Sequence, residues 1–516
     1  MQPLLRCGYR RETRPCEIAA PPCNRPGTTR VCCPMPASTQ RPLWIVPLTV
    51  ATALFMENTD STVIATALPS IAASLGEDPI ALKLALTSYL VSLAIFIPVS
   101  GWMADRYGAR TVFRAALVVF MLGSLACAAA NGLAWFVAAR FLQGMGGAMM
   151  VPVGRLVVLR SVPKSQLVTA LAYLTFPALV GPVLGPPLGG LITTWFDWRW
   201  IFFINLPIGV AGIVLASLYF EDVREPERPP LDLTGFFVLG TGLAALMLGL
   251  ASMGRHLLPA SISWGCLAAG AILLPLYVVH ARRVAHPIVR LDLMNRPTFR
   301  VAILGGSLFR VGTGAIPFLL PLMLQVGFGL DALHSGLITF AAAAGAMFVK
   351  TLAPKILRRL GFRAVMVFNA VLASAFLAVN GLYTADTPHW IMIALLFLGG
   401  CSRSVQFTCV NAIAYADLES REMSAATSFA SVCQQLSLSL GVTLGALALE
   451  GAAGFHGRTT IEAGDFGPAF FAVAVLSAAS VLAFRKLTPD AGAEISGRRI
   501  VAATPPASAE MKPRAS

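Results

Sequence analysis

Long apolar runs separated by short polar loops repeat along residues 43–485 of this 516-residue chain. Each run has roughly 20 residues, enough for a helix to cross about 30 Å of hydrocarbon. Helices are expected because a backbone exposed to lipid must satisfy its own hydrogen bonds. The runs lie near 43–68, 84–103, 111–130, 133–156, 166–192, 200–220, 233–252, 261–280, 299–325, 333–352, 364–383, 389–410, 423–449 and 467–485. The pattern predicts an all-α membrane protein with about fourteen transmembrane helices.

Composition excludes a water-soluble fold. Charged residues make up 12% of the chain and apolar residues 56%, whereas soluble domains carry roughly 25% charged residues. The formal net charge of +14 could suggest nucleic-acid binding. The basic residues, however, occur singly or in twos and threes between apolar runs, without a continuous stripe or interleaved aromatic residues. We therefore expect a lipid bilayer around the chain and no nucleic-acid partner.

Lysine and arginine concentrate in alternate loops. These loops contain Arg106, Arg110 and Arg114; Arg155, Arg160 and Lys164; Arg224 and Arg228; Arg282, Arg283, Arg290, Arg296 and Arg300; Lys355, Arg358, Arg359 and Arg363; and Arg421. The loops between them contain only Lys83, Arg199, Arg255 and Arg458. Because cytoplasmic loops hold the excess of basic residues, both termini are expected in the cytoplasm. The chain is then a multi-pass protein of the cell inner (plasma) membrane.

The two ends of the chain differ from the part between them. Residues 1–42 are rich in Arg, Pro and Cys and lack the apolar run that a signal peptide needs. Their cysteines also lack paired Cys-x-x-Cys spacing, so we expect no metal site. Residues 1–42 and 487–516 are expected to be disordered cytoplasmic tails, and Met35 is an alternative first residue.

A short sequence repeat suggests that the chain has two related halves. Asp105–Val112 and Arg358–Val365 share the pattern Arg-x-Gly-x-Arg-x-Val between two spans. If spans 1–6 pair with spans 9–14, spans 7 and 8 are an inserted hairpin, and transporters place binding sites between such repeats. The expected parts are two six-helix bundles and, between them, a linker with the inserted helices. Their boundaries are 43–220, 221–297 and 298–486.

Two carboxylates, Glu57 and Asp60, lie inside the first span. Three residues apart, they share one face of a helix. Two like charges this close in a low dielectric favour a shared or exchangeable proton, so both are candidates for proton coupling. Glu57 has an alternative interpretation, in which it lies near the membrane interface or pairs with a structural arginine.

Arg140 lies at a depth that matches Asp60. Asp60 is about eight residues below the outer end of the first span, and Arg140 is about seven below the outer end of the fourth. At 1.5 Å per residue both are roughly 10–12 Å deep, so they can touch if the helices are neighbours. Such an ion pair would either take part in proton coupling or only stabilise the folded structure. Arg310 and Arg403 are also intramembrane, and each is expected to face a solvated cavity or another carboxylate.

Glycine and proline are unusually dense in Gly181–Gly190, within the fifth span. They predict a bend and a close approach between helices, because both residues interrupt regular helix packing. A bend suits a protein that rocks between two states, and a rigid structural kink is the alternative.

Five motifs together resemble the major facilitator superfamily, in its fourteen-span drug:proton antiporter branch. The cytoplasmic loop after the second span has Gly101, Asp105, Arg106, Gly108 and Arg110, and the fourth span has Arg140, Gln143, Gly144, Gly147 and Ala148. The fifth span has the antiporter-type set Gly181, Gly185, Pro186, Gly189 and Gly190. Asp60–Pro69 and Trp198–Gly209 are similar to further motifs of the same branch.

The resemblance implies a polyspecific multidrug exporter that works by alternating access, driven by proton entry. Asp60 would be the carboxylate that takes the proton, and Arg140 would influence its protonation. Asp105 and Arg106 would latch the cytoplasmic side, and the glycine and proline motif would disfavour leak. The expected substrates are amphipathic or cationic small molecules, with the proton as coupling ion and no cofactor. Gln143, Arg310 and Arg403 are candidates for the substrate cavity.

Other functions remain open at this stage. One is a narrow exporter or importer of a single metabolite, for which Arg310 and Arg403 would bind an anion. A membrane receptor or enzyme is the least favoured, because the sequence has no nucleophile–base set, metal-spaced cluster or phosphate loop. We expect the protein to function as a monomer, and a periplasmic adaptor is a further candidate partner. Glu57 and Arg403 stand where the branch would have apolar or small residues, which leaves the charge of the substrate open.

Overall fold

The structure is a computed structural model that describes residues 42–77, 82–221, 230–253, 259–458 and 461–496. The expected tail 1–42 lies outside this range except for Pro42, as does the end of the chain from residue 497. Everything below concerns the compact unit Leu43–Ser516, within these described residues. Its secondary structure is helical, and no strand occurs among them.

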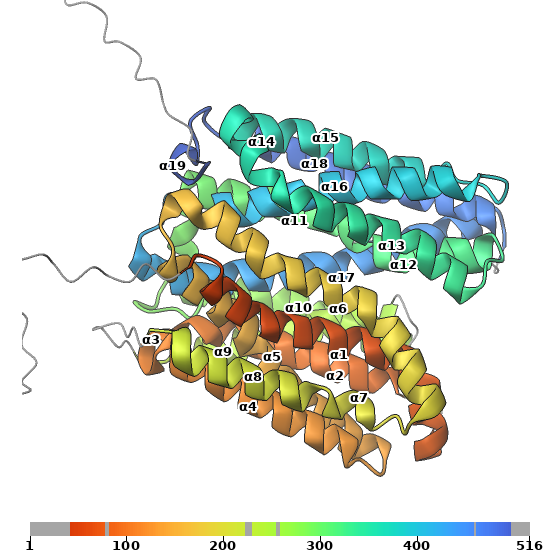
Figure 1. Cartoon of the computed structure of the whole chain (residues 1–516), viewed down its shortest axis with the longest axis horizontal. Coiled ribbons are helices and arrows are strands. Elements are labelled where there is room, and N and C mark those ends of the chain that lie inside the picture. The colour runs from red at the N-terminus through yellow and green to blue at the C-terminus, as the bar shows by residue number, and fades with distance from the viewer. Residues whose placement is uncertain (1–41, 78–81, 222–229, 254–258, 459–460, 497–516) are drawn as a thin grey trace, which may run out of the picture. The chain divides into compact units, whose positions relative to one another are not determined.

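The first helices form what we call the N bundle (Figure 1). It consists of α1 (Ile45–Leu75), α2 (Lys83–Phe96), η1 (Ile97–Val99), α3 (Ser100–Tyr107), α4 (Ala109–Ala128), α5 (Leu133–Ser161), η2 (Lys164–Gln166), α6 (Leu167–Trp195), α7 (Trp200–Phe203) and α8 (Asn205–Tyr219). Within it α1 packs against α5, α6 and α8, and α4 packs against α5 and α8. Two antiparallel helices, α9 (Leu233–Met253) and α10 (Ala260–Ala281), follow and pack against each other.

The remaining helices form what we call the C bundle. It consists of η3 (Leu291–Asn295), α11 (Pro297–Gly314), α12 (Ile316–Leu322), the π-helical turn η4 (Met323–Gly327), α13 (Ala332–Phe348), η5 (Val349–Thr351), α14 (Ala353–Leu360), α15 (Phe362–Asn380), α16 (His389–Ile413), η6 (Ser420–Glu422), α17 (Met423–Phe455), η7 (Ala463–Asp465), α18 (Phe466–Phe484) and α19 (Ala493–Ser496). Here α11 packs against α17 and α18, α13 against α16, and α15 against α16 and α18.

Each of the fourteen predicted runs coincides with one helix or with consecutive helices. By length and composition, 11 helices among the described residues could cross a membrane, or up to 12 if the bent pair His334–Thr351 and Ala353–Leu360 counts as one. The helices of the first and fifth runs, α1 and α6, have 31 and 29 residues. The expectation of an all-α, multi-pass membrane protein is therefore confirmed, while the number of crossings stays a prediction.

Residues 487–496 correct the expected start of the second tail. They are folded, with Leu487 and Ile495 buried, and α19 packs against α6 and α14. Two large apolar side chains among small and polar residues gave too little signal in the sequence, yet they anchor a short helix to the bundle ends.

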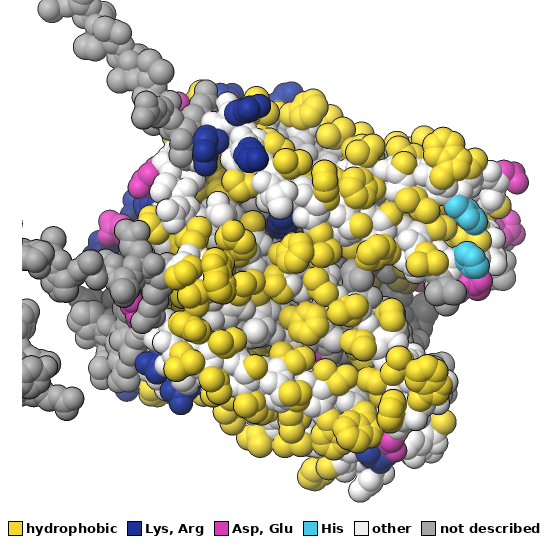
Figure 2. All heavy atoms as spheres, in the orientation of Figure 1, with side chains coloured by type: hydrophobic (Ala, Val, Ile, Leu, Met, Phe, Trp, Pro, Cys, Tyr) yellow, Lys and Arg dark blue, Asp and Glu magenta, His cyan; other side chains and the backbone are white. Residues whose placement is uncertain are grey.

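Side chains at the two ends of the helices differ. We call the end that holds α3, α14 and α19 the α3 end; Figure 2 shows Lys and Arg gathered there and hydrophobic side chains along the flank. Of the six exposed tryptophans among the described residues, Trp44 directly precedes α1 and the other five mark the opposite end: Trp135, Trp195, Trp200, Trp264 and Trp390. Because tryptophan favours the boundary between lipid and water, these residues indicate where the membrane surface lies.

The two bundles pack together at the α3 end and separate toward the other. One buried apolar cluster runs across both bundles and includes Phe113 of α4 and Val410 of α16. At the opposite end there are two clusters, one around Phe136 in the N bundle and one around Phe470 in the C bundle. The core is thus continuous at the α3 end and divided at the other.

The helix pair α9–α10 lies at the seam between the bundles. α9 packs against α2 of the N bundle and α17 of the C bundle. Thr443 of α17 donates a hydrogen bond to the carbonyl oxygen of Leu250 at 3.0 Å. Within the pair, His280 contacts Asp232 at 2.9 Å, and Ser263 donates to Ser252 at 2.8 Å. The pair therefore adheres to both bundles rather than to one.

Candidate functional site

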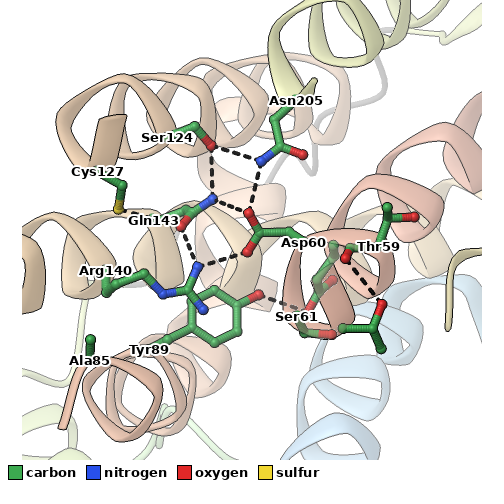
Figure 3. Close-up of polar contacts among 12 residues, drawn as sticks. Thr59, Asp60, Ser61, Ala85, Tyr89, Ser124, Cys127, Arg140, Gln143 and Asn205 are labelled. Carbon is green, nitrogen blue, oxygen red and sulfur yellow. Dashed lines mark hydrogen bonds and ion pairs between the residues drawn. The ribbon is translucent and has the colours of Figure 1, made fainter. Parts of the chain in front are cut away.

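Asp60 of α1 is the centre of a buried polar cluster in the N bundle (Figure 3). Arg140 of α5 donates from Nη1 to Asp60 Oδ2 at 2.7 Å, and the two residues are only 1% and 2% exposed. The contact that their matching depths allowed is therefore present. Because burial keeps bulk water away from both charges, each depends on the other for neutralisation.

Three uncharged side chains complete the cluster. Gln143 donates from Nε2 to Asp60 Oδ1 at 2.9 Å, and Asn205 of α8 donates from Nδ2 to the same oxygen at 2.8 Å. Ser124 of α4 accepts from Gln143 at 2.8 Å and from Asn205 at 3.1 Å. Asp60 thus accepts from two amides and one guanidinium, an arrangement that suits an ionised carboxylate. Gln143, expected to line the substrate cavity, is instead fully buried in this cluster.

Glu57, one turn before Asp60, has different partners. The hydroxyl of Tyr89 in α2 donates to Glu57 Oε1 at 3.3 Å, while Glu57 Oε2 is buried without a hydrogen-bond partner. The Tyr89 ring also faces the Arg140 guanidinium, with 4.4 Å between Cζ and the ring centroid. Tyr89 therefore connects the environments of the two carboxylates.

The glycine-rich segment of α6 lies directly against α1. A Cβ on Gly181 would come 2.9 Å from Thr59 Oγ1, and one on Gly185 would come 2.0 Å from Thr62 Oγ1. The predicted close approach is thus present between α6 and α1, within one turn of Asp60. Gly190, by contrast, has nothing within 4 Å of such a Cβ. The backbone of α6 runs through Gly181, Gly185, Pro186, Gly189 and Gly190 as one uninterrupted helix.

A second polar cluster joins the bundles at the α3 end. Asp105 of α3 forms an ion pair with Arg160 of α5 at 3.3 Å and accepts a short hydrogen bond from Ser424 of α17. Ser424 is the second residue of α17, so the carboxylate lies at the amino-terminal end of that helix, which favours a negative charge. A Cβ on Gly101 would come 2.6 Å from the Ser424 carbonyl oxygen. Only glycine therefore allows this contact between α3 and α17.

Further contacts reinforce the junction at the α3 end. Ser100 and Ser428 hydroxyls are 2.9 Å apart, and Lys164 donates to the Ala416 carbonyl oxygen at 3.2 Å. Within the C bundle, Arg296 contacts Glu422 at 3.1 Å. Burial alone would raise the pKa of Glu422, but the Glu419 backbone N–H and the Arg296 guanidinium together hold it below its usual value.

The other three residues of the loop motif have local roles in this structure. The Arg106 guanidinium lies over the rings of Trp102 and Tyr107, at 5.4 and 5.9 Å, and not in the junction with α17. Gly108 has φ +88°, which permits the sharp turn from α3 into α4. Arg110 donates to the Ser217 carbonyl oxygen of α8. In the second copy of this loop pattern, Arg358–Val365, the equivalent glycine, Gly361, has φ +77°.

Arg310 and Arg403 lie in the C bundle, apart from the Asp60 cluster. Arg310 of α11 donates to Asn411 Oδ1 of α16 at 2.9 Å, and its guanidinium is 5.8 Å from the Phe407 ring centroid. Arg403 of α16 lines a small cavity together with Thr313 of α11 and other side chains of the C bundle. Among the described residues, neither arginine forms an ion pair.

Sequence reasoning missed Ser124, Asn205 and Tyr89. Asn205 did carry a signal, because it is an amide within an apolar run, two residues before a proline. Ser124 carried none, since a serine hydroxyl in an apolar helix can bond to its own backbone. Tyr89 carried none, since a tyrosine in a membrane span can equally belong at the boundary between lipid and water. In the part of the chain that the structure describes, no three His, Cys, Asp or Glu residues lie close enough to hold a metal ion.

The sequence has many relatives. Residues 50–442 match the Major Facilitator Superfamily, and residues 302–509 give a second match to it. The chain is 39% identical over 462 residues to "Putative multidrug resistance protein MdtD" of Cronobacter sakazakii, which covers 88% of this chain and 96% of that protein. The protein of the same name from Escherichia coli strain K12 is 39% identical over 417 residues, 80% of this chain and 87% of the relative.

Solved structures share the fold. The human organic anion transporter MFSD10 superposes with a TM-score of 0.61 at 15% identity, covering 86% of this chain and 99% of that one. The proton:xylose symporter XylE superposes with a TM-score of 0.60 at 13% identity, covering 85% and 94%. At such low identity, these likenesses establish the helical architecture and nothing about the transported molecule.

Proposed function

The chain belongs to the major facilitator superfamily, and from this premise we propose that it is a proton-coupled antiporter that exports amphipathic small molecules. It is a membrane transporter and not an enzyme. The single observation that carries the proposal is the ionisable Asp60, buried against Arg140 between α1 and α5 at a contact of 2.7 Å. The names of its relatives, which refer to multidrug resistance, support efflux of more than one compound.

Proton uptake by Asp60 would change the packing of the N bundle. The ionised carboxylate accepts three hydrogen bonds, from Arg140, Gln143 and Asn205. A proton on Asp60 removes the negative charge that neutralises Arg140. It also turns one carboxylate oxygen, which now accepts a hydrogen bond, into an O–H donor that faces another donor. The cluster spans α1, α4, α5 and α8, so its rearrangement shifts those helices against one another. Glu57, with one unpartnered oxygen, is a second candidate to take up a proton.

The division of the core suggests which state of the cycle the structure represents. Contacts between the bundles, including Asp105 with Ser424, close the α3 end, whereas the apolar core is divided at the opposite end. We assign the α3 end to the cytoplasm, because its side chains are rich in Lys and Arg. In this outward-facing state a proton enters from outside and neutralises Asp60, and substrate leaves outward. The protein then reverts and releases the proton inside.

The remaining parts of the proposal follow from the same arrangement. Asp105, Arg160 and Gly101 keep the cytoplasmic side shut while the other side is open. Gly181 and Gly185 hold α6 close to α1, which limits leak past the Asp60 cluster. We place the protein in the cell inner membrane with both termini cytoplasmic and propose that it acts as a monomer. An adaptor in the periplasm remains a prediction from the sequence.

A narrower function is the second candidate. Arg310 and Arg403 are intramembrane cations without a carboxylate partner among the described residues, which favours an exporter or importer of a single anionic metabolite. A panel of substrates of both charges distinguishes it from polyspecific efflux, since the narrow transporter would move one chemical class only.

The test uses the full chain reconstituted in proteoliposomes with an imposed pH gradient. Two fluorescent probes on one xanthene core serve as cargo, cationic rhodamine 123 and anionic 5-carboxyfluorescein. The gradient should drive transport of at least one probe, and a protonophore or Asp60→Asn should abolish the drive. Asp386→Asn, the same chemical change at an exposed position, is the control. Equal gradient-driven transport by wild type and Asp60→Asn would contradict the proposal.

A further inference from the structure

We propose, resting on the antiport function above, that the C bundle contains the site for the negatively charged group of the transported molecule. Arg310 would be its main ligand, with Arg403 beside it. The cargo is then an amphipathic organic anion, with a carboxylate as the group that is held. The N bundle would then take up the proton, and the C bundle would bind the charged group of the substrate.

Arg310 is held in place but not neutralised. It is 3% exposed, and its Nη2 donates to the amide oxygen of Asn411 at 2.9 Å. Its guanidinium faces the Phe407 ring, and its Nε is buried without a hydrogen-bond partner. The side chain is therefore fixed by uncharged contacts that leave its positive charge and at least one donor available.

The distribution of charges makes Arg310 unlike Arg140. The spans α11, α13, α15 and α16 contain no aspartate or glutamate, although Arg310 and Arg403 lie well inside α11 and α16. Arg140, in contrast, has Asp60 as its counter-ion. Buried charges in proteins are normally paired, and intramembrane charges mark the path of a substrate or ion. An anion from outside the chain would supply the partner that Arg310 lacks.

Arg403 extends the positive surface along α16. Arg403, Phe407 and Asn411 are spaced four residues apart, so they lie on one face of the helix, about 6 Å from one turn to the next. Arg403 lines a cavity with Thr313 and Asn380, two polar side chains that can also bond to a ligand. The Phe407 ring, which faces the Arg310 guanidinium and comes one turn after Arg403 along α16, offers an apolar surface for the body of the molecule.

These features favour a carboxylate over a simple inorganic anion. A guanidinium presents parallel N–H groups that match the two oxygens of a carboxylate, and such charge-assisted pairs are about twice as strong as neutral ones. The adjacent aromatic ring would gain from contact with an apolar or aromatic body. The combination fits a molecule with one acidic end and one hydrophobic end.

The first experiment measures binding without transport. Fluorescence anisotropy would follow 5-carboxyfluorescein and rhodamine 123 on the full chain in uncharged detergent. Arg310→Gln, which can still donate to Asn411, should weaken 5-carboxyfluorescein binding about tenfold or more, and Arg310→Lys should restore part of it. Binding of rhodamine 123 should stay the same or increase. Arg359→Gln, an exposed arginine of α14, is the matched control.

The second experiment measures gradient-driven transport of both probes in phosphatidylcholine vesicles. The same preference should appear there, with the anionic probe transported and Arg310→Gln selectively slowing it. If wild type binds rhodamine 123 better than 5-carboxyfluorescein, or if Arg310→Gln weakens both probes equally, the anion site is refuted. If binding behaves as expected but no gradient drives either probe, the proposed antiport fails while the anion site stands.

Discussion

Replacing Asp60 by asparagine separates the charge of this side chain from its shape. Asparagine keeps an oxygen that can accept from Gln143 and Asn205, whose amides lie 2.9 and 2.8 Å away. It also sets an NH₂ group against Arg140 Nη1, so two donors meet where the 2.7 Å ion pair was. Arg140, only 1% exposed, then has neither counter-ion nor water. Removing one partner of a buried pair costs about 3–5 kcal/mol, and we expect a loss of unfolding free energy of this size.

A second substitution tests the cause of that loss. Arg140→Gln removes the cation that Asp60→Asn leaves behind, so the double variant should be less destabilised than the sum of the two single variants. The difference should be about 0.5–3 kcal/mol, the range for coupled neighbours. The double variant should also remain folded and yet transport without response to a pH gradient.

The assay is unfolding of the purified protein in mixed micelles, titrated with sodium dodecyl sulfate and followed by tryptophan fluorescence. Asp386→Asn reports what the chemical change costs at an exposed site. The reasoning is refuted if Asp60→Asn costs no more than Asp386→Asn, or if the effects of the single variants simply add. Either result would mean that the charge pair does not hold α1 to α5.

Three further predictions concern the places where the helices meet. Gly101→Ala would put a Cβ 2.6 Å from the backbone of α17 and so push α3 away from α17. Double electron–electron resonance should therefore report a longer distance between spin labels on α3 and α17. Gly185→Ala should cost about 1–3 kcal/mol of unfolding free energy by overpacking against α1, whereas Gly190→Ala, with open space around it, should cost almost nothing. The pKa of Glu422 lies below its ordinary 4.5, so its contact with Arg296 stabilises the fold above that pH and is lost as the pH falls through the lowered value. Glu422→Gln should therefore flatten the acid side of the stability profile, and an unchanged profile would contradict this.

The helices could be predicted from the sequence better than their ends. Apolar runs located every long helix, but α1 continues to Leu75, beyond the expected 68, and α17 continues to Phe455, beyond the expected 449. Hydropathy reports the thickness of hydrocarbon, whereas a helix ends where its backbone hydrogen bonds end. Ala, Gly and Ser make up most of the extensions 69–75 and 450–455, and they continue the helical hydrogen bonds while adding little to the hydropathy of the run.

The charged pair of the site could be predicted because depth along a helix follows from residue count. Asp60 and Arg140 are also costly inside a membrane, so each demanded a partner. The sequence could not show that Gln143 belongs to their cluster, since its direction depends on how α1 and α4 pack against α5. Arg106 illustrates the same limit, because its motif predicted a junction while its side chain packs on neighbouring aromatic rings.

The position of α9 has a consequence for molecules dissolved in the bilayer. The seam between the bundles has two sides. On one side α9 lies between the bundles, packed against α2 and α17, whereas on the other side α6 packs directly against α13 and α16. A lipophilic compound that arrives sideways from a leaflet therefore meets an additional helix on the first side. On the second side it meets the two bundles in direct contact, so it can enter only where a change of state parts α6 from α13 and α16.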